Sequence, residues 1–402
     1  MNERERFLAT MHGGQPDRCP IMDFSFWDET IQVWHDQGLP VAVDRSTSDE
    51  YFGMDGLERH VVSRLSTATF APSTARAHVE VPGVNVGLYP VFEQIVIEDR
   101  GDHEVIQQPD GVRVLRKKFM SSIPMHQGHQ LIDKASWEQH YAPRLDPDRP
   151  DRLPEDWDRW VALWSKNDRA DPLFLPGGSL FGWLRNWMGI EAVSYVVYDD
   201  PAWFEQMVNT IADCIVGVLR RVLASGVRFD ACGMWEDMCF NAGPLLSPDH
   251  FRKYLVPQYK RITELLREHG VDVVWVDCDG KIDDLIPLWL EGGVNCMMPV
   301  EIGTWCADPV AFRKRFGKEL LMMGGFDKHL LALSQSAIER EVQRLTPLVE
   351  TGGYVPFCDH RVPPDVPLAN YVFYLKRARC VWGKDLNLKP MHEPELVAGD
   401  GR

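Results

Sequence analysis

The chain has 402 residues, of which 45% are hydrophobic and 25% charged, and a formal net charge of −16 at pH 7. This acidic balance argues against binding to nucleic acid and against docking to anionic lipid, because both need concentrated Lys and Arg. No apolar stretch approaches the ~20 residues that span a bilayer and no signal peptide is visible, so we expect a cytoplasmic protein.

The N-terminal half contains few regular patterns. Residues 19–26 are predicted as a strand. Residues 92–98 and 112–119 alternate apolar and polar side chains on either side of Pro109-Asp110-Gly111, a turn-forming tripeptide. We interpret this pattern as a β-hairpin inserted within about 80–120.

The remaining elements alternate between short apolar runs and amphipathic helical patterns. The runs predict strands at 172–175, 228–234, 271–276, 294–300, 320–323 and 354–357. Helices are predicted at 28–37, 248–269, 281–291, 308–317, 335–351 and 367–382. Short, continuously apolar strands between helices are typical of parallel sheets covered on both faces. We therefore predict an α/β fold, a TIM (β/α)8 barrel with the inserted hairpin in its N-terminal half, as one domain over 1–388 followed by a tail over 389–402.

Acidic residues and histidines follow the predicted strands. In a barrel of this kind, catalytic groups lie at the carboxyl ends of the strands, on one rim. The candidates at that rim are Asp23, Glu236, Asp277, Asp279, Glu301, Asp327, His329 and His360. Carboxylates brought together raise one another's pKa, which suits proton transfer, or they are neutralised by a metal. The rim is therefore the expected place of the chemistry.

Helix capping is the alternative explanation for each of these residues. For Asp279 and Asp327 we weigh capping and function equally, because Asp before a helix satisfies free backbone N–H groups. Glu236 and His360 are poor N-caps, and Asp277 lies two residues earlier than a cap would. We therefore expect catalytic roles for Glu236, Asp277 and His360, with Asp23 as a fourth catalytic candidate.

Metal and substrate contacts are predicted from the same rim. Zinc accepts His, Cys and carboxylate ligands, so the candidate metal set is Glu236, Asp277, Asp279 and His360. No HxxxH, HExxH or CxxC spacing supports it. Aromatic rings near strand ends can stack on a flat ligand. The candidates for substrate binding are Trp27, Trp235, Glu301, Asp327 and His329, whereas Trp275, inside a strand, is expected in the core.

Several motifs resemble those of the uroporphyrinogen decarboxylase superfamily. They are Arg4 to Ala9 with Gly14 to Pro20, Gly243 to Pro248, Gly324 to Asp327, Gly352 to Tyr354 and Val362 to Pro367. The resemblance runs over nearly the whole chain, in matching order and spacing. It implies a TIM-barrel enzyme of one of two branches. One decarboxylates uroporphyrinogen without a cofactor, and the other comprises zinc-dependent methyltransferases that move methyl groups between corrinoid proteins and a thiol or other acceptor.

The chain departs from both branches at the residues that distinguish them. The decarboxylases carry an Arg-rich motif after the first strand, where this chain reads Met22 to Glu29 without any Arg. The methyltransferases place zinc on a His-x-Cys pair and a later Cys, and these positions correspond to Asp277, Asp279 and His360. The resemblance therefore implies either a divalent metal on a harder ligand set or metal-free proton transfer by the same three residues.

Three functional hypotheses remain open. The first is methyl transfer, with or without a metal, between a small methylated substrate and a corrinoid on a partner protein or another acceptor. The second is decarboxylation of a uroporphyrinogen-like or aromatic carboxylate, with Asp23 as the acid that protonates the new carbon. The third is a binding barrel without catalysis. We rank decarboxylation second, because a polyanionic porphyrinogen is repelled by an acidic rim. The oligomeric state is open.

Overall fold

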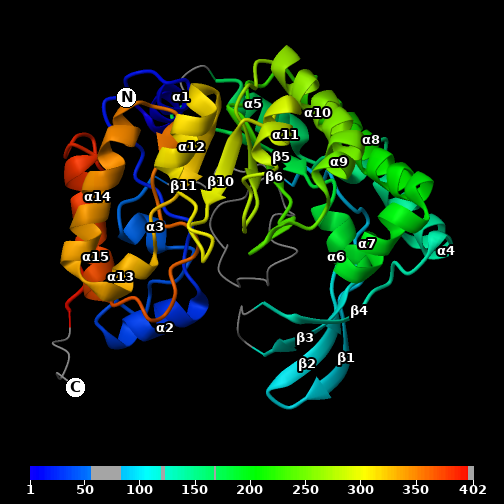
Figure 1. Ribbon diagram of the computed structural model, residues 1–402, viewed down its shortest axis with the longest axis horizontal. Coiled ribbons are helices and arrows are strands. Elements are labelled where there is room, and N and C mark those ends of the chain that lie inside the picture. The colour runs from blue at the N-terminus through cyan, green and yellow to red at the C-terminus, as the bar shows by residue number, and fades with distance from the viewer. Residues whose placement is uncertain (56–82, 119–122, 167–168, 397–402) are drawn as a thin grey trace.

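A six-stranded parallel sheet forms the centre of the protein (Figure 1), whose computed structural model describes residues 1–55, 83–118, 123–166 and 169–396. The strand order is β12-β11-β10-β9-β6-β5, so strands that follow one another along the chain are neighbours. All neighbouring pairs are parallel. The strands are β5 (Phe174–Gly178), β6 (Ala231–Trp235), β9 (Val274–Asp277), β10 (Cys296–Val300), β11 (Leu321–Gly324) and β12 (Tyr354–Val355).

Helices occupy every connection between these strands. From β5 to β9 they are α6 (Gly182–Met188), α7 (Ile190–Asp199), α8 (Pro201–Leu223), α9 (Pro248–His250), the π-turn η5 (Phe251–Leu255) and α10 (Val256–Glu268). From β9 onward they are α11 (Ile286–Glu291), α12 (Pro309–Phe316), η6 (Gly317–Glu319), α13 (His329–Leu333), α14 (Gln335–Glu350) and α15 (Leu368–Val381). A two-stranded ribbon, β7 (Cys239–Phe240) with β8 (Gly243–Pro244), follows β6. This alternation confirms the predicted α/β class.

The first predicted strand is reduced to a single bridge. The N-terminal segment forms α1 (Glu3–Met11), α2 (Asp28–Asp36) and α3 (Ser48–Tyr51). Between α1 and α2, only Phe26 forms a bridge, a parallel one to Val362. Ser25 has a φ of 99°, and this left-handed conformation interrupts the extended backbone. The prediction of a continuous strand over 19–26 was therefore wrong.

A separate antiparallel sheet of four strands replaces the single predicted hairpin. It contains β1 (Ile95–Arg100), β2 (His103–Gln107), β3 (Arg113–Lys117) and β4 (Met125–Gly128), in that order. The turn at Pro109-Asp110-Gly111 joins β2 to β3, with Gln107 opposite Arg113. The predicted pairing of 92–98 with 112–119 was wrong, since β2 lies between those two segments. Figure 1 shows this sheet standing away from the central sheet, beyond α6 and α7.

Short helical turns connect the two sheets. They are α4 (Lys134–Ser136), the π-turn η2 (Trp137–Tyr141), the 3₁₀ turns η3 (Ala142–Leu145) and η4 (Pro150–Arg152), and α5 (Trp157–Trp164). At the other end of the chain, the described part of the predicted tail has defined contacts. The ring of His392 stacks on Tyr51 at 5.5 Å, and Lys376 pairs with Glu393 at 2.8 Å.

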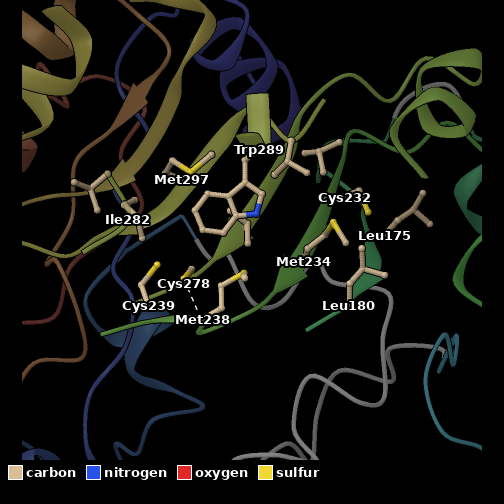
Figure 2. Packing of buried hydrophobic residues seen from close by; sticks show 14 of the residues in the cluster. Leu175, Leu180, Cys232, Met234, Met238, Cys239, Cys278, Ile282, Trp289 and Met297 are labelled. Carbon is tan, nitrogen blue, oxygen red and sulfur yellow. Dashed lines mark hydrogen bonds between the residues drawn. The ribbon is translucent and has the colours of Figure 1, made fainter. Parts of the chain in front are cut away.

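The central sheet is apolar on both faces, as parallel sheets are. Along β9, Val274 and Val276 belong to the large cluster between sheet and helices, whereas Trp275 belongs to a second cluster on the other face. Phe7 of α1 packs in that second cluster. Figure 2 shows the large cluster, with Trp289 of α11 packed among side chains of the strands. Trp275 is 4% exposed, which confirms its expected place in the core.

Among the residues described, no helix combines the length and the apolar character that crossing a membrane requires.

Candidate active site

Three carboxylates meet where β6 and β9 end. Asp277 is the last residue of β9, Asp279 follows two residues later, and Asp237 lies two residues beyond β6. Because β6 and β9 are neighbours with Trp235 opposite Asp277, their carboxyl ends deliver these side chains to one place. One ligand atom from each of the three residues lies within 4.8 Å of the others. We call Asp237, Asp277 and Asp279 the acidic cluster.

The burial and the close approach of the carboxylates in the acidic cluster favour an additional positive charge beside them. Asp237 has a φ of 39°, a region that Asp adopts more readily than most residues. Its Oδ1 accepts a hydrogen bond of 3.2 Å from the backbone N–H of Asp279. Burial, and then the charge of Asp279, raise the pKa of Asp237 to about 7. The Oδ1 atom of Asp279 is buried without a hydrogen-bond partner. A proton or a metal ion would relieve both conditions.

His360 lies against the acidic cluster. Its Nε2 is 3.2 Å from Oδ2 of Asp279, so the chain after β12 reaches the end of β9. The imidazole ring also neighbours two aromatic rings, Phe24 at 5.5 Å and Trp27 at 5.8 Å between centroids. The guanidinium carbon of Arg361 is 4.9 Å from the centre of the Trp27 ring. The structure thus brings together Asp277, Asp279, His360 and Trp27, as the sequence predicted.

Asp23 has a separate set of partners. Its Oδ2 accepts a 2.7 Å hydrogen bond from the Tyr371 hydroxyl, and its Oδ1 accepts one of 2.8 Å from the Phe24 N–H. Burial raises the pKa of Asp23 to about 7, although these hydrogen bonds and one from Cys358 oppose the rise. A carboxyl group with such a pKa can give or take a proton near neutral pH.

Glu236 faces away from the acidic cluster and holds a loop. Its carboxylate is fully buried and accepts five hydrogen bonds of 2.6 to 2.9 Å. The donors are Ser179 Oγ, the backbone N–H groups of Leu180, Phe181 and Gly182, and the Tyr259 hydroxyl. Five donors saturate one carboxylate, and a metal or a substrate would have to displace them. This geometry corrects the assignment of Glu236 to the catalytic and metal-binding residues.

Glu301 belongs to a second charged group beside the acidic cluster. Its Oε2 accepts a 2.9 Å hydrogen bond from the Gly280 N–H, and its Oε1 lies 3.8 Å from Nζ of Lys328. The same ammonium is 3.6 Å from Oδ1 of Asp359, which is fully buried. Asp359 also accepts backbone hydrogen bonds from Ile302 and Lys328. Burial raises the pKa of both carboxyl groups, and the charge of Lys328 opposes the rise.

The remaining predicted residues lie farther out or have other partners. Asp327 Oδ1 accepts hydrogen bonds from the backbone and the ring of His329, at 3.0 and 2.8 Å, so these two residues form a local pair. The side chain of His329 is 65% exposed. Trp235 stacks under Arg185, whose guanidinium carbon lies 5.3 Å from the ring centre. The Nη2 atom of Arg185 is 3.9 Å from Asp237 Oδ2, so this pair borders the acidic cluster.

Sequence reasoning missed four charged residues of this region. Asp237 directly follows Glu236, and its ability to adopt a left-handed conformation was the available signal. Lys328 and Asp359 each stand next to a predicted residue, in Asp327-Lys328 and Asp359-His360. Arg185 carries no local signal, because it reaches the site from α6, far along the chain.

Sequence comparisons with known proteins point to one superfamily, and a comparison with solved structures supports the fold. The family "Uroporphyrinogen decarboxylase (URO-D)" matches residues 184–380. Uroporphyrinogen decarboxylase of Syntrophotalea carbinolica is 26% identical over 186 residues, which cover 45% of this chain and 50% of that protein. The enzyme of a Nostoc species is 22% identical over 191 residues, 46% of this chain and 51% of its own. A solved structure described as a methyltransferase from Methanosarcina mazei covers 94% of this chain and 98% of its own, with a TM-score of 0.57 and 12% identity. The chain is a divergent member of the uroporphyrinogen decarboxylase-like superfamily.

The sequence match of this superfamily member is confined to its C-terminal half. The chain spans about half the length of the curated relatives it matches. The motifs from Gly243 to Pro367 lie inside the matched residues, whereas those at 4–20 lie outside them. The fold likeness extends over nearly the whole chain. The site residues from Asp237 to His360 therefore lie in the segment that carries the relationship.

Proposed function

We propose that this superfamily member is a metal-assisted methyltransferase. It would move a methyl group between a small methylated substrate and a corrinoid carried by a partner protein, or another acceptor. The observation that supports this proposal is the acidic cluster. Asp277 and Asp279 occupy the positions that correspond, by resemblance, to the zinc ligands of the methyltransferase branch. Asp237 adds a third carboxylate within 4.8 Å.

The residues present fit a divalent cation. Asp237, Asp277 and Asp279 would hold it, and the buried, unpartnered Oδ1 of Asp279 is available as a ligand atom. Three carboxylates form a harder ligand set than thiolates, which favours Mg²⁺, Mn²⁺ or a zinc ion with oxygen ligands. When bound, such an ion would supply Lewis-acid polarisation at the atom that gives or receives the methyl group.

The side chains around the acidic cluster have distinct roles in this proposal. His360 orients Asp279 through its Nε2 and can take the proton that the acceptor loses on methylation. Trp27 and Phe24 offer aromatic faces to a methylated substrate next to that imidazole. Lys328 keeps Glu301 and Asp359 in place, at 3.8 and 3.6 Å, so that the neighbouring loops hold their positions.

Decarboxylation is the second candidate, and Asp23 favours it. A pKa of about 7 leaves this carboxyl group partly protonated near neutral pH, as an acid that protonates a new carbon must be. Against this candidate stand the acidic cluster, which repels a polycarboxylate, and the absence of Arg between Met22 and Glu29.

We also propose that the sheet closes as a (β/α)8 barrel within one domain. The bridge between Phe26 and Val362 supports closure, because it continues the strand order beyond β12 toward the N-terminal segment. The strand order supports the same proposal, because strands that are neighbours in the sheet follow one another along the chain, as they do in a barrel.

Metal titration and a methyl-transfer assay test the proposal together. Metal-stripped protein titrated with Mn²⁺, Zn²⁺ and Mg²⁺ should bind one ion per chain. D279N should weaken that binding about 100-fold, since it removes a charged ligand. D327N is the matched control, because Asp327 lies at another strand end and, among the described contacts, its side chain forms hydrogen bonds only with His329.

The loaded protein should then consume methylcobalamin in the presence of a small thiol, and D279N should not. Metal-free protein that decarboxylates uroporphyrinogen would overturn the proposal. An ion bound with equal affinity by wild type and D279N would also overturn it.

A further inference from the structure

Arg185 is a cation beside the acidic cluster whose hydrogen-bond donors the described residues leave unused. Its Nη2 lies 3.9 Å from Oδ2 of Asp237, which is an ion pair but too long for a hydrogen bond. Its Nε is buried without an acceptor, and its Nη atoms donate to no described residue. The side chain is 23% exposed, and only Nε of its three nitrogens is fully buried. The Nη end of the guanidinium is therefore accessible to a ligand.

An arginine that only balances a carboxylate in this protein forms short hydrogen bonds. Arg18 donates from both Nη atoms to the two carboxylate oxygens of Asp55, at 2.6 and 2.9 Å, in a buried pair. Arg185 differs, since Asp237 balances its charge without accepting its hydrogen bonds. The planar fork of Arg185 thus remains available for an oxyanion, which accepts two parallel N–H groups.

The neighbours of Arg185 hold it in place. Its guanidinium carbon lies 5.3 Å from the centre of the Trp235 ring, so one face of the planar group is covered. The carboxylate of Glu236 binds the backbone N–H groups at the start of α6, the helix that carries Arg185. Trp235, Glu236 and Asp237 are consecutive, so the loop after β6 fixes both the helix and the guanidinium. A ligand would meet an arginine that is already oriented, which lowers the entropic cost of binding.

The four-stranded sheet contributes two imidazoles near Arg185. Figure 1 shows β4 running from this sheet toward α6. The rings of His126, on β4, and His129, directly after it, pack edge to face at 5.3 Å. Nδ1 of His129 donates a 3.0 Å hydrogen bond to the carbonyl of Asn186, the residue after Arg185. Burial, and then the charges of His129 and Arg185, lower the pKa of His126. His126 is therefore neutral near pH 7 and has one N–H that can donate to an anion.

A cation on the acidic cluster would change the charge balance of Arg185. In the metal-free protein, Asp237 is its ion-pair partner. In the proposed function, Asp237 becomes a ligand of a divalent ion, so the ion and Arg185 share one carboxylate. An anionic group on the substrate would restore the balance and accept the unused hydrogen bonds. Binding of the ion and of the anion should therefore favour each other.

We propose that Arg185 binds a carboxylate of the substrate, so that the substrate class is a small carboxylic acid with a methylated oxygen, nitrogen or sulfur atom. The proposal rests on the proposed function, in which the ion on the acidic cluster receives the methylated atom. A carboxylate matches the planar fork of arginine. A single carboxylate also differs from the polycarboxylate that the acidic cluster repels.

Binding of methoxyacetate and of its uncharged amide, methoxyacetamide, tests the proposal. Saturation-transfer NMR on the full chain with Mg²⁺ should show methoxyacetate bound in about the millimolar range and methoxyacetamide about tenfold more weakly or less. R185Q should weaken methoxyacetate binding about tenfold or more and leave the amide unchanged. R185K keeps the charge but not the fork, so its loss should be smaller. R252Q is the matched control, because Arg252 forms its ion pair with Glu291, and both side chains are exposed.

Metal binding supplies a readout of opposite sign. R185Q removes a positive charge 3.9 Å from a ligand of the ion, so it should bind Mn²⁺ several-fold more tightly than wild type. An R185Q variant that binds Mn²⁺ more weakly overturns the proposal, because Arg185 would then support the fold of the site.

Methoxyacetate that binds wild type and R185Q equally, or no better than its amide, overturns the proposal as well. If the ion still binds in that case, the proposed function stands. Methoxyacetate binding that depends on Arg185, in a protein that takes up no metal, supports the carboxylate site and overturns the metal-assisted function.

Discussion

The carboxylate of Glu236 is structural, in contrast to the neighbouring carboxylates of the acidic cluster. We predict that E236Q destabilises the protein and leaves metal binding intact. Glutamine has nearly the same shape, but it keeps one acceptor oxygen and gains two N–H donors. Oε1 now accepts from Leu180 and Tyr259, and Oε2 accepts from Ser179, Phe181 and Gly182. Whichever way the amide turns, its NH₂ group meets at least one backbone N–H that cannot change its role.

The expected loss follows from the number of donors left without an acceptor. A buried donor without a partner costs about 1–3 kcal/mol. With the amide nitrogen in the place of Oε1, the Leu180 N–H is left alone, while the Tyr259 hydroxyl can turn and accept. Adding the weaker charge of the remaining acceptor, E236Q should lower the free energy of unfolding by about 2–4 kcal/mol. The unfolding entropy of a chain of 402 residues is roughly 0.8 kcal/mol/K, so Tm should fall by about 2–5 °C.

Differential scanning calorimetry with and without Mn²⁺ measures both halves of this prediction. Y259F removes one donor and leaves the acceptor intact, so it should cost only about 1 kcal/mol. D279N is the opposite case, because it should need about 100-fold more Mn²⁺ for the same stabilisation while changing the metal-free Tm little. An E236Q variant with wild-type Tm that no longer responds to Mn²⁺ would refute the reasoning and return Glu236 to the metal ligands.

Two further predictions concern charge and pH. Burial raises the pKa of Asp23 from 3.8 in the unfolded chain to about 7, so the folded state binds the proton more tightly and stability from this group is lost as pH rises between the two values. D23N should therefore flatten that part of a curve of Tm against pH. An unchanged slope in D23N would contradict this prediction. K328M removes the cation that opposes the rise in pKa of Glu301 and Asp359. It should therefore destabilise the protein more as pH rises and these carboxylates ionise. A loss in Tm that does not change with pH would contradict this.

The strands and helices of the central sheet could be predicted because their pattern is local. Runs such as 294–300 are apolar on both faces, and each predicted strand from 172 onward overlaps an observed one, β5 to β12. The segment 19–26 is also largely apolar, but Ser25 adopts a left-handed conformation that could not be predicted from its residue type. The hairpin was mispaired for a related reason. A turn signal at Pro109-Asp110-Gly111 identifies a reversal of the chain, but not which strands meet across it.

The position of the site could be predicted, and the partners of its residues could not. That carboxyl ends of neighbouring strands meet is a property of any parallel sheet, so Asp277, Asp279 and His360 were found from their place in the sequence. The role of Glu236 depends on Leu180, Phe181 and Gly182, more than 50 residues away. A Cβ on Gly182 would lie 2.4 Å from the Glu236 carbonyl oxygen, and only the assembled fold reveals that contact.

Glu236 and Asp237 are neighbours in the sequence, yet the first carboxylate caps a helix and the second belongs to the acidic cluster. Glu236 is a poor cap for the helix that follows it in the sequence, but it caps the start of α6, the helix that follows β5. Because those hydrogen bonds fix the loop after β6, the next residue is held with its side chain against Asp279, at the cost of a left-handed φ of 39°. Strain of this kind persists only where the surroundings impose it, and it is common at functional sites. The rigid carboxylate of Glu236 therefore positions Asp237, and a cation on the acidic cluster would offset the repulsion that this positioning creates.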